Sequence, residues 1–132
     1  MFEALRISAS GMTAERLRMD VIASNIANAQ TTRDVDGEPY RRRQVVLRPG
    51  AGFDAVLRGV EVAAIQEDPR PPRRVYDPGH PDADAEGYVS LPNISPVTEM
   101  VDLIGSSRAY EANVTALNQA KQMFTRTLDL LR

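Results

Sequence analysis

The residues most able to do chemistry in this chain lie in a short acidic loop. An aspartate or glutamate stands at every second position from Asp82 to Glu86, and Gly87 follows. Oxygen ligands at the first, third and fifth positions with glycine at the sixth resemble the start of a calcium-binding loop. The glutamate that completes such a loop is replaced by Asn93, and the prolines before the loop prevent the helix that should precede it. The pattern therefore disfavours a metal site.

The single histidine, His80, is the other candidate for catalysis. A nucleophile–base–acid triad would have to use it, but the chain has no cysteine and no GxSxG motif. It also has no GxGxxG, no P-loop and no paired histidines. We expect His80 to be a turn residue, and we predict no catalytic residue, no cofactor and no enzymatic activity.

A basic run, Arg41 to Arg43, could contact phosphate or an acidic partner. Side chains in a strand alternate between its two faces, and acidic residues outnumber basic ones in this region. We therefore expect a solvated edge or an edge that faces an interface. The whole chain has 16 basic and 18 acidic residues, a net charge of −2. This balance argues against nucleic-acid binding, which depends on neutralising phosphates.

The elements that position these residues are indicated by the prolines. All nine lie between Pro39 and Pro96. Because proline removes a backbone donor and clashes inside a helix, this distribution predicts a helix, an irregular middle and a second helix. No run of 18 apolar residues occurs, so we expect no direct membrane insertion. The N-terminus lacks a basic region followed by an apolar one, which disfavours a cleaved signal peptide.

The first predicted helix covers residues 1–29 and has apolar residues on two sides. One row repeats every seven residues, and a second row lies roughly opposite to it. The rest of the chain is too small to cover both sides of a helix about 43 Å long. Apolar surface on two faces therefore favours contacts with other chains. The residues predicted for these contacts are Leu5, Met12, Met19 and Ile26 in one row, and Ile7 and Val21 in the other.

The second predicted helix begins at Pro96, because Ser95 can cap it and proline suits the first helical turn. Glu99 then lies near the positive end of the helix dipole. Two rows that repeat every seven residues form a coiled-coil seam, interrupted by Ser107 and Lys121. The first predicted helix is its partner. The seam residues predicted for assembly are Leu103, Tyr110, Leu117, Phe124 and Leu131, with Met100, Val114 and Leu128 in the companion row.

The middle of the chain predicts three or four short strands, over residues 40–47, 59–65, 73–77 and 87–91. The linker over 68–74 contains three prolines. The predicted fold class is therefore α+β, with an antiparallel pair of long terminal helices and a small inserted β-rich module. Residues 1–38 and 96–132 are expected to form a helical assembly domain, and residues 39–95 the inserted domain.

The string from Ile7 to Ala29, ISASGMTAERLRMDVIASNIANA, resembles the terminal signature of bacterial flagellar rod, hook and related axial proteins. Residues 75–89 and 96–114 resemble two further blocks of the proximal rod members of that family. The likeness covers nearly the whole chain. One departure is Gly105-Ser106, where alanine-like helix formers are expected. Glycine there costs about 1 kcal/mol relative to alanine, and it indicates a bend or a close helix contact.

The resemblance implies a structural subunit of the flagellar basal-body rod in the periplasm. Family members polymerise through their terminal helices into the drive shaft that transmits torque from the membrane ring to the hook. The implied partners are copies of the chain, other rod proteins, and proteins of the membrane ring and next to the export gate. The implied export route is the flagellar type III apparatus, without a cleaved signal.

Two alternatives come from other classes. The first is a coiled-coil adaptor or membrane-surface protein. Acidic residues offset the arginines of the first helix, however, and membrane helices favour a basic face. Liposome flotation distinguishes this alternative. The second is a small metal-dependent enzyme built on the acidic loop, which calorimetry with calcium and zinc tests.

Overall fold

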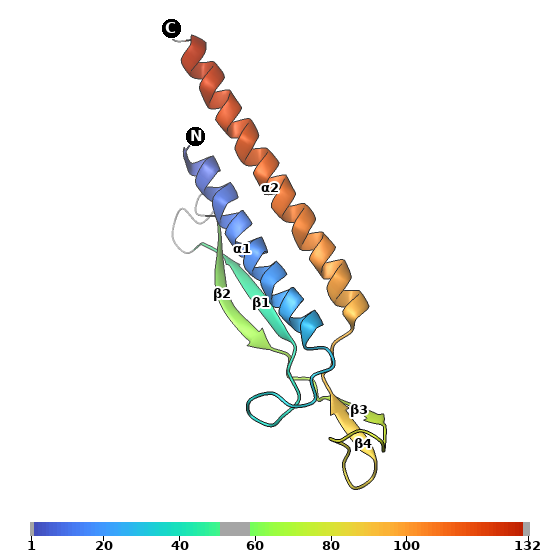
Figure 1. The fold of residues 1–132 in the computed structure, drawn as a ribbon. Coiled ribbons are helices and arrows are strands. Elements are labelled where there is room, and N and C mark those ends of the chain that lie inside the picture. Colours follow the sequence, from blue (N-terminus) through green and yellow to red (C-terminus); the bar gives the residue numbers. More distant parts are fainter. Residues whose placement is uncertain (1, 51–58, 131–132) are drawn as a thin grey trace.

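Two long antiparallel helices frame the molecule, α1 (Phe2–Ala27) and α2 (Pro96–Leu130) (Figure 1). The computed structural model describes residues 2–50 and 59–130 of the chain. Between the helices the chain forms four strands, at positions near the predicted ones. The predicted α+β fold with paired terminal helices is confirmed. The strands are β1 (Arg43–Pro49), β2 (Val60–Glu67), β3 (Arg73–Tyr76) and β4 (Tyr88–Leu91).

Polar side chains define the ends of both helices where they meet the middle of the chain. The Ser95 hydroxyl accepts a hydrogen bond from the backbone N–H of Thr98 at 3.4 Å, and its carbonyl accepts one from Glu99 at 3.0 Å. Ser95 therefore caps α2 as predicted. Beyond the end of α1, the Asn28 side chain donates to the Ser24 carbonyl at 2.9 Å. The same carbonyl also accepts from the Asn28 backbone N–H at 3.0 Å, so Asn28 binds the last turn of α1 twice.

The helices pack closely along α1. A side chain on Gly11 would place its Cβ 3.0 Å from the Asn113 side chain of α2, and the rings of Phe2 and Phe124 lie 6.0 Å apart. A glycine inside α1 is thus explained by the approach of α2.

The α2 seam differs in part from the predicted one. The row of Leu103, Tyr110 and Leu117 is half-buried, as a seam requires. The companion row is only partly buried: Val114 is half-buried, but Met100 is 52% exposed and Leu128 is 50% exposed. At the start of α2 the buried positions are instead Glu99 and Ser106, so the chain buries polar residues there, which apolar character does not predict. Leu131 lies outside the described residues.

The strands pair as two separate antiparallel hairpins and not as one sheet. The β1–β2 hairpin runs beside α1, and the β3–β4 hairpin lies beyond the last turn of α1 and the first turn of α2 (Figure 1). Strand β1 starts three residues later than predicted and ends on Pro49, which pairs with Val60. The division into a helical and an inserted domain stays a prediction.

Helix α2 continues past the start of α1 (Figure 1). It has 35 residues against 26 in α1, and Phe2 already meets Phe124 near its end. Every residue from 121 to 130 is exposed, and we call this segment the α2 tail. None of the described helices is long and apolar enough to span a membrane.

Candidate assembly interface

A buried polar cluster joins α1, α2 and the start of β1. Asn25 of α1 and Glu99 of α2 are each only 1% exposed. The Asn25 Nδ2 donates to Glu99 Oε2 at 3.0 Å, and Arg42 Nε donates to Glu99 Oε1 at 2.5 Å. The Arg42 Nη2 also reaches Asp102 Oδ2 at 3.4 Å. We call Asn25, Arg42 and Glu99 the clasp, because it ties the two helices and the hairpin together.

The clasp asparagine uses all of its hydrogen-bonding capacity. Its Nδ2 donates to the Arg43 carbonyl at 2.8 Å as well as to Glu99. Its Oδ1 accepts from the Arg43 backbone N–H at 3.0 Å and from the Tyr40 hydroxyl at 3.2 Å. An amide offers two donors and two acceptor sites, so none is left unpaired. Towards Arg43 it makes the two bonds that a neighbouring strand would make.

The three arginines of the basic run differ in burial and in their partners. Arg41 and Arg43 are about half exposed and pair weakly, with Glu38 at 3.5 Å and Glu67 at 3.7 Å. The expectation of a solvated edge is correct for these two. For Arg42 it is wrong, because that side chain is 15% exposed and pairs with buried Glu99. Because Glu99 is buried in the seam, the arginine that pairs with it is largely buried as well.

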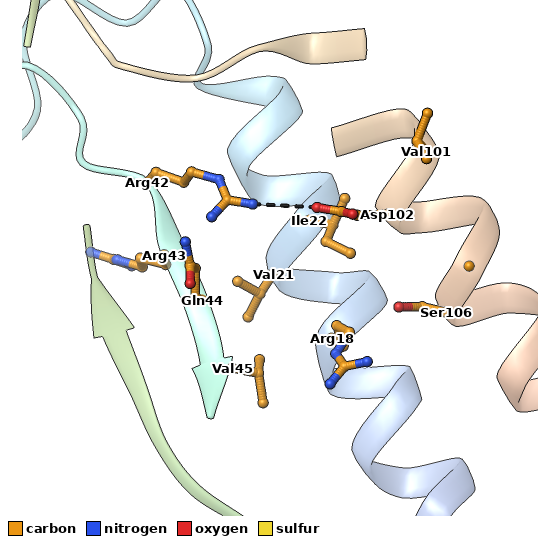
Figure 2. A pocket seen from close by; sticks show the side chains of 11 residues that line it. Arg18, Val21, Ile22, Arg42, Arg43, Gln44, Val45, Val101, Asp102 and Ser106 are labelled. Carbon is orange, nitrogen blue, oxygen red and sulfur yellow. Dashed lines mark hydrogen bonds and ion pairs between the residues drawn. The ribbon is translucent and has the colours of Figure 1, made fainter. Parts of the chain in front are cut away.

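A groove of about 500 Å³ lies next to the clasp, between α1, β1 and α2 (Figure 2). Val21 and Ile22 of α1 and Val45 of β1 give it an apolar lining. Its α2 wall includes Val101, Gly105 and Ser106, and charged side chains, Arg18, Arg42, Arg43 and Asp102, also line it.

The start of α2 also carries an exposed apolar face, which we call the outer stripe. Its members are spaced i, i+3, i+4 and i+7, which puts them on one side of a helix. They are Val97, Met100, Val101 and Ile104, which are 72%, 52%, 63% and 55% exposed. Of these, only Met100 belongs to the predicted assembly residues. The spacing in the sequence is the signal that could have found the others.

Most of the predicted assembly residues lie between the elements of the chain itself. Ten are half-buried: Leu5, Ile7, Met12, Met19, Val21, Ile26, Leu103, Tyr110, Val114 and Leu117. Phe124 is 37% exposed, and Met100 and Leu128 are exposed as well. Their contacts with other chains stay a prediction.

The acidic loop is used for turn structure. Asp82 pairs with Arg33 at 2.8 Å and accepts from the Thr32 hydroxyl at 2.6 Å. Asp84 accepts from the Tyr88 backbone N–H at 2.8 Å and from Arg74 at 2.5 Å, and these contacts, the first above all, lower the pKa of Asp84. Within the described ranges, no group of three potential ligands is placed to hold a metal ion.

His80 lies in the same turn. Its Nδ1 accepts a hydrogen bond from the backbone N–H of Asp82 at 3.0 Å. The histidine is therefore a turn residue, as expected from the sequence.

Comparison with known proteins identifies the family. The model of "Flagella basal body rod protein" matches residues 5–33, and that of "Flagellar basal body rod FlgEFG protein C-terminal" matches residues 85–130. Flagellar basal-body rod protein FlgC of Bacillus subtilis is 48% identical over 145 aligned positions, which cover 98% of this chain and 97% of the relative. The chain belongs to the FlgC family. FlgC of Borreliella burgdorferi is 42% identical, over 100% of this chain and 98% of its own, and FlgC of Aquifex aeolicus is 45% identical, over 98% and 96%.

Membership in the FlgC family makes the chain a structural component of the flagellar basal-body rod. It confirms the predicted rod role, the predicted location in the basal body and the prediction that the protein is not an enzyme. The two matched segments contain most of α1 and all of α2. The clasp residues Asn25 and Glu99 lie one in each matched segment.

Proposed function

We propose that this chain polymerises through its two helices, with copies of itself and with other rod proteins, into the drive shaft that transmits torque from the membrane ring to the hook. Proteins of the membrane ring and next to the export gate are its further partners. It reaches the rod through the flagellar type III export apparatus and assembles in the periplasm. Residues 1–38 and 96–132 form the assembling part, and residues 39–95 face outward.

The observation that carries the proposal is the exposed apolar surface of α2. The outer stripe and the α2 tail together expose seven large apolar side chains by 50% or more: Val97, Met100, Val101, Ile104, Met123, Leu128 and Leu130. Isolated apolar residues on a surface are common, but a contiguous stripe indicates an interaction site. Burial of that stripe against neighbouring subunits stabilises the assembly by about 25 cal/mol for each Å² removed from water.

The clasp supports the same function from inside the chain. A shaft under torque needs subunits in which the two helices do not slide past each other. The hydrogen bonds of Asn25 and Arg42 to Glu99 fix the helices in one register, because a slip would leave buried polar groups unpaired. Rigidity thus comes from polar contacts within the subunit, and association from apolar contacts between subunits.

A charge placed on the outer stripe tests the proposal. Ile104→Asp changes a side chain that is 55% exposed, so the isolated chain should keep its helix content and its melting temperature. Rods should fail to assemble, and the bacterium should lose motility. Val35→Asp is the control, because Val35 is 99% exposed in a turn. A motile strain whose purified rods contain the Ile104→Asp chain in normal amount would refute the proposal.

A further inference from the structure

The β3–β4 hairpin has one buried face and one exposed face. Val89 is 2% exposed, and its cross-strand partner Val75 is half-buried. The next pair of the ladder is Tyr76 with Tyr88. Their side chains lie on the opposite face, because successive residues of a strand point to opposite sides. Tyr76 is 64% exposed and Tyr88 is 39% exposed. We call Arg74, Tyr76 and Tyr88 the tyrosine face.

The side chains of the tyrosine face hold each other in place. The two rings meet edge to face with their centroids 5.3 Å apart, and the Arg74 guanidinium lies 4.8 Å from the centroid of the Tyr88 ring. Gly87 has a φ of 83°, and a Cβ there would lie 3.0 Å from the Tyr76 ring, so glycine lets this ring pack against the backbone. The exposed rings are therefore fixed before a partner binds, which reduces the entropy cost of binding.

The tyrosine face has the composition of a protein interface. Tyrosine and arginine are enriched among the residues that contribute most to binding, because a ring brings a large contact area at a small entropy cost. The contact between the rings also stabilises the hairpin, but it leaves most of Tyr76 in water. The hairpin lies at one end of the molecule, beyond the last turn of α1 and the first turn of α2, where a neighbouring chain can reach it (Figure 1).

The charges near the tyrosine face favour a basic partner. Residues 73–91 contain two arginines and four acidic residues, so the hairpin and its turn carry a net charge of −2 with the histidine neutral. Arg74 pairs with Asp84 at 2.5 Å and with Glu86 at 3.7 Å, so two carboxylates share one cation. The Glu86 side chain makes the longer contact and is 74% exposed. This carboxylate is accessible to a cation of another chain.

A second carboxylate lies next to the exposed ring of Tyr76. Asp77 follows the tyrosine directly in the sequence and is exposed, and its Oδ1 accepts the Gly79 backbone N–H at 3.2 Å. Glu86 precedes Gly87, whose backbone packs against the same ring. A lysine or arginine placed over the Tyr76 ring would therefore make a cation–π contact with two carboxylates nearby.

We propose that the tyrosine face binds a segment of a different protein that carries arginine or lysine. Arg74 already makes such a contact with Tyr88 within the chain, and the more exposed Tyr76 offers the same contact to a partner. The whole chain has a net charge of −2, so a second copy brings no surplus of positive charge. The inference rests on the proposed function, in which other rod proteins are partners, and adds to it where one of them binds and what it carries.

A photo-reactive residue tests the contact in the assembled rod. Ser90→p-benzoylphenylalanine places the probe beside Tyr88, because Ser90 is exposed and pairs with Arg74 on the tyrosine face. The labelled chain is expressed in the native bacterium and irradiated, and mass spectrometry identifies the crosslinked peptides of the isolated rods. The expected adduct joins the probe to a peptide of a different protein, with arginine or lysine close to the attachment. The same probe at Val35, which is 99% exposed in a turn, is the control and should not give this adduct.

Charge reversal shows whether the carboxylates select the partner. Asp77→Lys combined with Glu86→Lys should abolish the adduct, whereas Asp77→Glu combined with Glu86→Asp keeps both charges and should retain it. Both positions are exposed, so the isolated chains should keep their melting temperature. An adduct that survives charge reversal, an adduct to a second copy or to a glycan, or no adduct in rods that contain the labelled chain would overturn the inference and leave the proposed function intact. Rods from which the natural chain is missing would count against both.

Substitution of the exposed tyrosine gives a readout without the probe. Tyr76→Phe keeps the ring and should enter rods in normal amount, whereas Tyr76→Ala should be depleted from them and reduce motility. Val75→Ala is the matched control, because it weakens the same hairpin from its buried face and leaves the tyrosine face intact. Normal incorporation of the Tyr76→Ala chain, or equal depletion of the Val75→Ala chain at the same melting temperature, would show that the ring serves only the hairpin.

Discussion

Arg42 donates a hydrogen bond from Nε to Glu99 Oε1 across 2.5 Å, although 57 residues separate the two in the sequence. The arginine comes directly before β1, and the glutamate lies in the first turn of α2. Both side chains are largely removed from water, at 15% and 1% exposure. Because Asn25 of α1 contacts the same carboxylate, this ion pair couples the hairpin to the helix pair. We expect the three elements to unfold together.

The first prediction concerns the loss of this ion pair. Arg42→Ala leaves the Glu99 carboxylate buried without its cation, which costs about 3–5 kcal/mol of unfolding free energy. Arg48→Ala is the matched control, since Arg48 and Glu61 form an exposed pair at 3.4 Å and its loss should cost less than about 1 kcal/mol. Urea unfolding of the isolated chains measures both. Equal losses for the two variants would show that the clasp adds no stability.

The second prediction concerns Asn25. Asn25→Asp removes the donor to the Arg43 carbonyl and places a second carboxyl group about 3 Å from Glu99, so it should cost about 2 kcal/mol or more at pH 7. The two carboxylates repel each other, which raises the pKa of the new aspartate in the folded state. The Asn25→Asp chain is therefore more stable at low pH, where the new aspartate is protonated, and it loses this stability as the pH rises through the raised pKa.

Asn25→Ala is the reference for this experiment, because it removes the same hydrogen bonds without adding a charge. The difference in unfolding free energy between the two variants should shrink as the pH falls from 7 to 4. A difference that stays constant over this range would contradict the predicted repulsion.

The sequence predicts the helices better than the contacts between elements. Pro96 and Ser95 locate the start of α2 correctly, because proline and capping preferences act over a few residues. The role of Glu99 is not predictable in the same way. Its position indicates only an acid near a helix N-terminus, whereas its burial depends on Arg42, far away in the sequence. Likewise, alternation indicates a strand but not its partner, so the two separate hairpins are visible only in three dimensions.

The third prediction is a pH dependence in the turn after β2. The Arg70 side chain, and then its backbone N–H, hydrogen-bond to Asp68 and lower its pKa from 3.8 to about 2. Since the pKa in the folded state lies below the value of the unfolded chain, this contribution to stability is complete above about pH 4. It is lost as the pH falls through about 2.

Two measurements check this assignment. The Asp68 carboxyl resonance should titrate near pH 2 in the natural chain and at a higher pH in Arg70→Ala, which loses the side-chain hydrogen bonds but keeps the backbone N–H of residue 70. The stability difference between the natural chain and Asp68→Asn should be larger at pH 6 than at pH 2. An Asp68 titration that Arg70→Ala does not move would refute the role of the arginine.

The fourth prediction compares two glycines with left-handed backbone. Gly37 has a φ of 79° and Gly87 a φ of 83°, so alanine at either position costs about 1–2 kcal/mol in backbone strain. A Cβ on Gly87 would also lie 3.0 Å from the Tyr76 ring, whereas one on Gly37 would meet no described atom within 4 Å. Gly87→Ala should therefore lower the unfolding free energy more than Gly37→Ala. If urea unfolding gives the same loss of unfolding free energy for both variants, the Tyr76 ring moves away from the added methyl group without a cost in free energy.

The last prediction concerns the packing of α1 on α2. Gly11→Leu places a large side chain where even a Cβ would be 3.0 Å from Asn113, so it should cost about 1–3 kcal/mol through overpacking. The Asn113 amide cannot withdraw freely, because its Nδ2 donates to the Ala109 carbonyl at 2.9 Å. Gly105→Leu adds the same side chain on α2 in open space, and because leucine favours a helix more than glycine does, it should raise the unfolding free energy of the isolated chain. Urea unfolding of the two variants should therefore shift in opposite directions, and a Gly11→Leu chain as stable as the natural one would show that the helices separate there at no cost.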